Sequence, residues 1–159
     1  MSQAVAKYSF DEIMDDVFAP NQVRTREQWR DKIFKLQDCL VNQFSEHLEL
    51  EPTHRFCNGV YARELFMPQG TLIIGKIHRH EHLNIISHGS VSVITEDGLE
   101  HFCAPHTFIS KCGTKRVVYA HTDAIWTTIH PTQETDLEKI EEQIICKDYD
   151  DLELLGAPL

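Results

Sequence analysis

The feature that most constrains the fold is a stretch of short alternating segments between residues 60 and 130. Polar and apolar residues alternate there with a period of two, which is typical of half-buried β-strands. Strands are predicted at 65–66, 72–78, 83–87, 90–96, 99–104, 107–111, 116–120 and 125–130. Turn sequences containing glycine separate several of them, at 68–70, 96–98 and 111–113. So many short strands in one stretch predict a barrel or a sandwich.

Helical patterns precede the strand region. Ser9 with Glu12 forms a capping-box pattern, which predicts a helix that ends at Pro20. Thr25 with Gln28 repeats the pattern at the start of a longer helix. The apolar stripe of the longer helix consists of Trp29, Ile33, Leu36, Leu40, Phe44 and Leu48, and the helix ends before Pro52. We expect the stripe to pack on the sheet, although a coiled-coil or partner-binding face has the same pattern.

A third helix is predicted after the strands. Thr135 with Glu138 marks its start, its apolar stripe consists of Leu137, Ile140 and Ile144, and the acidic segment 148–159 resembles a terminal arm. The chain therefore divides into a helical N-terminal extension at 1–52, a barrel at 53–131 and a C-terminal helix with an acidic tail at 132–159.

Composition excludes some partners. With 25 acidic and 15 basic side chains the formal net charge is −10, which disfavours nucleic acid and anionic membrane surfaces. No apolar run approaches the ~20 residues that cross a bilayer, so we expect a cytoplasmic protein. The five cysteines form no Cys-x-x-Cys pair, which favours reduced thiols.

The segment from Gly70 to Gly89 carries the strongest motif, GTLIIGKIHRHEHLNIISHG. It resembles the first cupin motif, which has the order Gly, five residues, His, one residue, His, three or four residues, Glu, six residues, Gly. The two terminal glycines and His78 keep this pattern, whereas Lys76 replaces the first His and His82 replaces the Glu. The resemblance implies that His78 is a metal ligand, and His82 can serve as another because imidazole also binds metals.

A second segment, KCGTKR at 111–116, resembles the second cupin motif, Pro, any residue, Gly, two residues, His. Gly113 takes the glycine position and Arg116 takes the position of the last metal ligand, where a guanidinium cannot coordinate metal. The resemblance covers about residues 63–130. It implies a mainly β, cupin-like barrel (double-stranded β-helix or jelly roll) with an N-terminal helical extension and a short C-terminal helix.

Alternation along the strands predicts which side chains share the barrel interior. The inward sets are Leu72, Ile74, Lys76 and His78; His82, Asn84 and Ile86; and Arg116, Val118 and Ala120. A final hairpin that turns at 122–124 would pair Arg116 with His130 and bring His130 into the same interior. A turn one residue longer or shorter would direct His130 outward.

The predicted site therefore has three imidazoles and two cations. His78, His82 and His130 are the candidate ligands of a divalent transition metal such as zinc, iron, nickel or copper. Lys76 and Arg116 are the candidate groups that bind a small acidic ligand. Alternatives remain open: hydrogen-bonded imidazoles without a metal, a metal site formed by His78, His80 and His82 on one uninterrupted strand, and an ion pair between Arg116 and a buried Glu64. No catalytic residue is assigned, and Glu81, a candidate base, is expected to face solvent.

The strings HLNIISHGSVSVITEDG and TKRVVYAHTDAIWTTIHPTQETDLEKIEEQI resemble small cupin-like proteins of tailed-phage genomes. This resemblance implies a phage source and no single activity. Two functions follow. The first is an oligomeric binding or structural protein, incorporated in a virion tail or contacting other phage structural proteins. The second is a metal-dependent isomerase, lyase or dioxygenase that acts on a small acidic metabolite or sugar.

Overall fold

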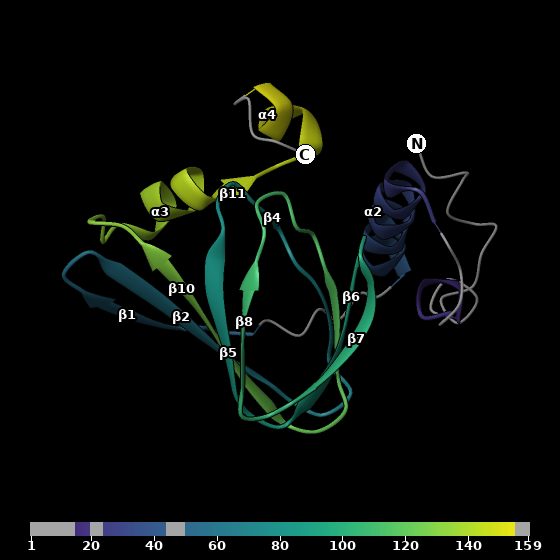
Figure 1. Cartoon of the computed structure of the whole chain (residues 1–159), viewed down its shortest axis with the longest axis horizontal. Helices are drawn as coiled ribbons and strands as arrows, with labels where there is room; N and C mark the ends of the chain where they lie inside the picture. Colours follow the sequence, from purple (N-terminus) through teal and green to yellow (C-terminus); the bar gives the residue numbers. More distant parts are fainter. Residues whose placement is uncertain (1–14, 20–23, 44–49, 155–159) are drawn as a thin grey trace.

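Two antiparallel β-sheets dominate the computed structural model, which describes residues 15–19, 24–43 and 50–154 (Figure 1). The strands are β1 (Thr53–Cys57), β2 (Val60–Met67), β3 (Leu72–Ile74), β4 (Ile77–His78), β5 (His82–His88), β6 (Ser90–Thr95), β7 (Gly98–Cys103), β8 (His106–Ser110), β9 (Val117–Ala120), β10 (Ala124–Pro131) and β11 (Ile145–Cys146). The helices are α2 (Arg26–Gln43), α3 (Leu137–Ile144) and α4 (Tyr149–Leu154). The predicted mainly-β class, with helices before and after the strands, is confirmed.

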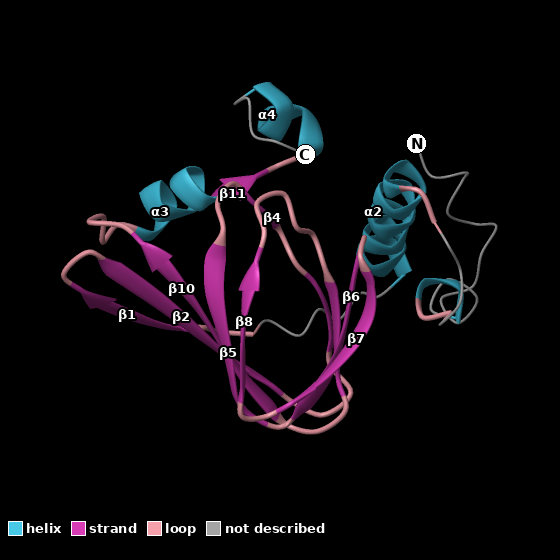
Figure 2. Cartoon of the chain, viewed as in Figure 1, coloured by secondary structure: helices cyan, strands magenta, loops and turns pink. Residues whose placement is uncertain are grey.

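The two sheets face each other and enclose a hollow. One has the strand order β1-β2-β10-β5-β8 and the other the order β3-β9-β6-β7, while β4 pairs with β11 in a separate two-stranded sheet. Figure 2 shows that the sheets meet at the lower end of the view and separate toward the end where α3 and β11 lie. The space between the sheets therefore opens toward α3.

The inner faces of the two sheets form an apolar core at the closed end. Its buried members are Met67, Ile86, Val91, Val93, Val118, Ala120, Ala124 and Trp126. They come from alternate positions of β2, β5, β6, β9 and β10, as the period of two predicts. Burial of each large aliphatic side chain contributes about 1.5–3 kcal/mol, so this core holds the sheets together without filling the open end.

Helix α2 covers the outer face of the four-stranded sheet. Its predicted capping box is confirmed: the Gln28 amide donates to Thr25 Oγ1 at 3.2 Å, and the Thr25 amide donates to Gln28 Oε1 at 3.0 Å. Trp29, Ile33 and Leu36 are buried in a cluster that also contains Ile94 of β6 and Val117 of β9. Phe44, Leu48 and most of the predicted helix between Ser9 and Pro20 lie outside the described residues. Among the described helices, none combines the length and hydropathy that a bilayer crossing needs.

Glycine is required at two of the motif positions. Gly89 has φ +81°, and a Cβ there would lie 2.1 Å from the Asp123 carbonyl oxygen. Gly113 has φ +80°, and a Cβ there would lie 2.8 Å from Leu152 Cδ2. L-residues rarely adopt such φ values, so both turns depend on glycine.

The C-terminal region differs from the prediction. The N-cap of α3 is Asp136, whose carboxylate accepts from the Lys139 amide at 3.1 Å, and not Thr135. The segment predicted as an arm contains α4, whose Tyr149 and Leu152 are buried against Ile77. Two strands, β1 and β11, were not predicted, because neither has a clear alternating pattern. All five cysteines are free: Cys39 and Cys146 are buried, Cys112 is half-buried, and Cys57 and Cys103 are exposed.

Candidate metal and ligand site

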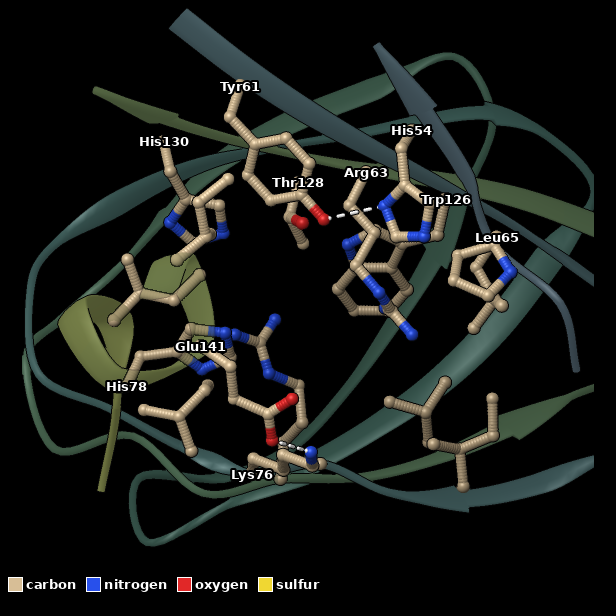
Figure 3. Close-up of a pocket in the computed structure, with 18 of the residues that line it drawn as sticks. His54, Tyr61, Arg63, Leu65, Lys76, His78, Trp126, Thr128, His130 and Glu141 are labelled. Atoms are coloured by element: carbon tan, nitrogen blue, oxygen red, sulfur yellow. Dashed lines mark hydrogen bonds and ion pairs between the residues drawn. The ribbon is translucent and has the colours of Figure 1, made fainter. Parts of the chain in front are cut away.

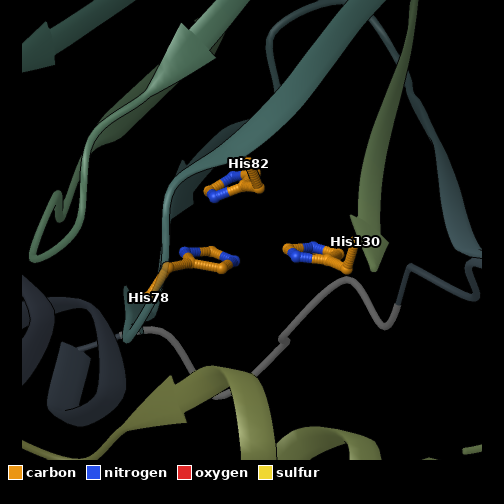
Figure 4. A group of neighbouring side chains, drawn as sticks. All are labelled: His78, His82 and His130. Carbon is orange, nitrogen blue, oxygen red and sulfur yellow. The ribbon is translucent and has the colours of Figure 1, made fainter. Parts of the chain in front are cut away.

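Three imidazoles converge at the open end of the barrel (Figure 4). His78 ends β4, His82 begins β5 after the bend at 79–81, and His130 lies near the end of β10. One ligand nitrogen of each lies within 4.8 Å of the other two. The ring centroids are 4.2 Å apart for His78 and His82, 5.5 Å for His78 and His130, and 4.7 Å for His82 and His130. The structure therefore brings together the three histidines that the sequence proposed as ligands.

The three rings are electrically neutral near pH 7. Burial is the largest cause in each case: it lowers the pKa of His78 to about 2 and those of His82 and His130 to about 4. The Arg116 guanidinium lowers all three pKa values further, and neighbouring imidazoles also lower those of His78 and His130. Neutral imidazole has the free lone pair that a metal ligand needs. His78 Nδ1 is buried without a well-formed hydrogen bond among the described residues, although the backbone of Lys76 lies close enough to raise the pKa of this imidazole.

Arg116 lies beside this group and is held by neutral partners. Its Nη2 donates to Ser110 Oγ at 2.7 Å, and its Nη1 donates to Asn84 Oδ1 at 3.3 Å. Nη2 also lies 3.3 Å from His82 Nε2, which is therefore the acceptor of this contact. The ring proton of His82 is then on Nδ1, which faces the His80 carbonyl at 3.3 Å. Burial lowers the pKa of Arg116 to about 10, so the guanidinium stays charged near pH 7.

The donor set fits a transition metal. Zinc binds imidazole nitrogen at roughly 2.0–2.1 Å, and three such nitrogens on one ion lie roughly 3.3 Å apart. The present separations, up to 4.8 Å, therefore require small side-chain rotations. Coordination through His82 Nε2 also requires Arg116 to release that nitrogen. Arg116 keeps Asn84 and Ser110 as partners after this change, so the cost is one hydrogen bond and the repulsion between two cations.

A cavity of about 470 Å³ adjoins the imidazoles. His78, His130 and Arg116 line one part of it, and Trp126 and Leu65 provide apolar wall. Further polar groups project into it from β1, β2 and β10, and Figure 3 shows them around the hollow: His54, Tyr61, Arg63 and Thr128. A volume of this size is in the range that holds a small metabolite.

Lys76 lies at the mouth of the cavity and not with the imidazoles. Its ammonium pairs with Glu141 of α3, and its side chain is 62% exposed. The prediction that alternation continues from Leu72 to His78 is wrong, because β3 ends at Ile74 and β4 begins at Ile77. Leu72 and Ile74 consequently pack with the α2 cluster, on the outer face of the sheet.

The predicted final hairpin is also wrong, although His130 does face the interior. β9 pairs with β3 and β6, whereas β10 pairs with β2 and β5 in the opposite sheet. His130 points inward because it shares its face of β10 with buried Trp126.

Three other interpretations can be compared with the structure. His80 is exposed, and the imidazoles whose ligand nitrogens lie within 4.8 Å of one another are those of His78, His82 and His130. Glu64 pairs with Arg55 at 3.1 Å and does not contact Arg116. Glu81 is exposed, as expected.

Arg63, Tyr61 and His54 were missed by the sequence reasoning. Alternation in β2 places Tyr61, Arg63, Leu65 and Met67 on the face that lines the cavity. A predicted strand that began at Val60 would therefore have given the inward position of Arg63. His54 is on β1, which was not predicted; its Nδ1 lies 2.8 Å from the Tyr61 hydroxyl.

The two facing antiparallel sheets and the histidine-lined cavity define a cupin-like β-barrel. The sequence matches no protein-family model and no curated protein. Among solved structures, a cupin-2 domain protein from Shewanella frigidimarina is 11% identical, with a TM-score of 0.43 over 60% of this chain and 92% of that chain. The Cnp3 cupin domain of Schizosaccharomyces pombe is 18% identical, with a TM-score of 0.46 over 63% and 72%. KdgF from Halomonas sp. is 13% identical, with a TM-score of 0.46 over 55% and 86%.

Proposed function

We propose that this protein is a cupin-like barrel that binds a divalent transition metal through His78, His82 and His130 and holds a small acidic ligand beside it. One observation carries the proposal: three neutral imidazoles, half-buried His78 and buried His82 and His130, have ligand nitrogens within 4.8 Å of one another, and two of them, His78 and His130, line a ligand-sized cavity. Zinc, iron, nickel and copper all suit three imidazoles with an open position.

The residues around the metal site have separate roles in this proposal. A bound metal ion supplies a Lewis acid that polarises an oxygen of the ligand. Asn84, whose Oδ1 also accepts from Trp126 Nε1 at 3.0 Å, fixes the position of Arg116. Among the described residues that line the cavity, Glu141 is the only carboxylate, and its pairing with Lys76 holds it at the mouth. These roles support ligand binding more directly than a particular reaction.

Metal analysis of the purified protein tests the proposal. We expect about one zinc ion per chain after dialysis against zinc, and His78→Gln and His130→Gln should each weaken zinc binding by at least about a hundredfold. His80→Gln is the matched control, because it removes an exposed imidazole from the same segment. A wild-type protein that binds no metal, or variants that bind as well as the wild type, would refute the metal site.

A second candidate is the oligomeric structural role, and the outer face of the five-stranded sheet favours it. Ala62, Ile129, Leu83 and Ile109 form one row across β2, β10, β5 and β8. Leu83 is 37% exposed and Ile109 is 60% exposed. These four side chains are uncharged, and the row continues on β1 with Arg55, which pairs with Glu64, so contact between two copies along the uncharged part buries apolar surface without burying charge. The occupant we propose is therefore a second copy of this chain.

Light scattering after gel filtration separates this role from a monomeric one. The wild type should be a dimer that Ile109→Glu converts to a monomer, while Leu99→Glu, an exposed position on the other sheet, should leave the dimer intact. Incorporation in a phage particle is a further step of this candidate, and mass spectrometry of purified virions tests it. A monomer that is absent from virions would remove the structural role.

A further inference from the structure

The cavity has an uncompensated positive charge. Among the described residues that line it, the charged side chains are Arg63, Lys76, Arg116 and Glu141, a net of two positive charges. Lys76 and Glu141 pair with each other at the mouth. The two guanidinium groups therefore face the interior without a carboxylate, and a metal ion on the imidazoles would add two further charges. An anion is the component that this interior lacks.

The two guanidinium groups differ in how they are held. Arg116 is 6% exposed and contacts three polar side chains, Asn84, Ser110 and His82, so it is fixed as part of the wall. The Arg63 side chain makes no hydrogen bond or ion pair with any residue that the structure describes, and the residue is only half-buried. Its fork of donors is consequently free to bind a ligand.

The position of Arg63 directs those donors across the cavity. It lies on β2, where its register partners are His54 of β1 and Thr128 of β10. Figure 3 shows its side chain extending into the hollow, opposite His78 and His130. The guanidinium is close enough to His130 to contribute to the low pKa of that imidazole. Arg63 and the imidazoles thus form two separate attachment points within one cavity.

The surface between these two points determines what kind of ligand fits. Trp126, Leu65 and Val118 provide apolar wall, and the Thr128 side chain adds a hydroxyl group beside Arg63. A ligand that satisfies both ends needs an acidic group at each end and a short carbon chain between them. A guanidinium binds a carboxylate through two parallel hydrogen bonds, which favours a carboxylate at the Arg63 end.

We propose that the cavity binds a short dicarboxylic acid, with one carboxylate on the metal held by the three imidazoles and the other on Arg63. The inference rests on the proposed function, since it requires the metal. It assigns Arg63 as the residue that selects the ligand, whereas the sequence proposed Arg116 and Lys76. It also makes metal and acid binding cooperative, because each relieves the charge imbalance that the other meets.

Calorimetry on the zinc-loaded protein, with excess zinc removed, tests this assignment. Oxalate, malonate, succinate and glutarate are the probes, each compared with its monoamide and its diamide. At least one dicarboxylate should bind about tenfold or more tighter than its monoamide, and no diamide should bind, since a charge-assisted hydrogen-bond pair accounts for roughly that factor. Equal binding of an acid and its diamide would overturn the proposal.

Variants separate this inference from the metal site. Arg63→Gln should reduce affinity for the preferred acid by about tenfold or more without weakening zinc binding in the absence of acid, because it removes a positive charge that acts on His130. Arg63→Lys should restore part of the loss of acid affinity. Arg55→Gln is the matched control, an exposed arginine on neighbouring β1. Zinc binding with no acid selectivity, or selectivity that persists in Arg63→Gln, would refute the inference and leave the metal site standing. A protein without zinc affinity would refute both.

Reciprocity gives an independent test. The factor by which the acid raises zinc affinity must equal the factor by which zinc raises acid affinity. Both factors should exceed about tenfold in the wild type and should persist in Arg63→Gln, because that variant loses the contact with Arg63 and keeps the carboxylate on the metal. Acid binding of equal strength with and without zinc would place the acid away from the metal and overturn the bridged arrangement.

Discussion

Two buried regions of this protein have opposite properties. Beneath α2, Trp29, Ile33 and Leu36 fill the space against the outer face of the four-stranded sheet with apolar atoms. Between the sheets, the open end holds three imidazoles and a guanidinium beside a cavity of about 470 Å³. The first region is closely packed and contributes stability. The second contains a cavity and polar groups whose transfer from water into the protein costs free energy.

The difference shows where function is located in the fold. Burying polar groups without full compensation costs free energy, and apolar side chains in the same positions would avoid that cost. The cluster under α2 has one such group, Trp29 Nε1, which is buried and has no hydrogen-bond partner among the described residues, while its other members interact by apolar burial. The imidazoles and Arg116 therefore mark the region that needs an explanation beyond stability, and a bound ligand provides one.

Acid should distinguish the two regions most strongly. The folded-state pKa of His82 and of His130 is about 4, below the ordinary 6.5, so between pH 6.5 and 4 the unfolded chain binds protons that the folded protein does not. Stability is therefore fully present above pH 6.5 and is lost as the pH falls toward 4. Lowering the pH from 7 to 5 should cost on the order of 2 kcal/mol per imidazole, as measured by urea unfolding of the metal-free protein.

Proton NMR supplies the control for this expectation. The ring signals of His82 and His130 should titrate below pH 5, whereas removing an exposed ring that does not act on them, as in His88→Gln, should leave the pH dependence of unfolding unchanged. Equal unfolding free energies at pH 5 and pH 7 would show that the buried imidazoles are charged in the folded state.

The packed region should respond to truncation and not to pH. Ile33 is fully buried in the α2 cluster, so Ile33→Ala leaves a cavity and should lower the free energy of unfolding by about 2–5 kcal/mol. Val41→Ala, at a position that is 60% exposed on the same helix, should change it by less than about 0.5 kcal/mol. Similar losses in both variants, measured by urea unfolding, would mean that α2 does not pack as described.

Much of the fold could be predicted because its signals are local. The capping box of Thr25 and Gln28, the apolar stripe of α2 and the glycine turns each depend on residues close in sequence. Helix α4 and strand β11 depend on distant partners: Tyr149 and Leu152 are buried against Ile77, and Ile145 pairs with His78. Local patterns do not identify such contacts.

The site could be predicted in part for the same reason. His78, His82 and Arg116 follow from motif spacing and alternation within a single strand. The position of His130 depends on which strands pair, and β10 joins β2 and β5 in place of β9. Lys76 was misplaced because the chain leaves the strand conformation at Gly75, where Gly75 N donates to the Arg116 carbonyl at 2.8 Å.

The mouth of the cavity should show the smallest effect. Lys76 and Glu141 join β4 to α3 by an ion pair whose side chains are 62% and 55% exposed. Exposed pairs contribute about 0.2–1 kcal/mol, so Lys76→Met and Glu141→Gln, alone and combined, should show a coupling energy in that range that disappears in 1 M salt. Lys35→Met and Asp31→Asn give the matched cycle for the exposed pair within α2. A coupling energy well above 1 kcal/mol would show that the pair fixes α3 over the cavity. A value near that of the α2 pair would mean that α3 is held in place by buried Ile140 and by the pairing of β4 with β11.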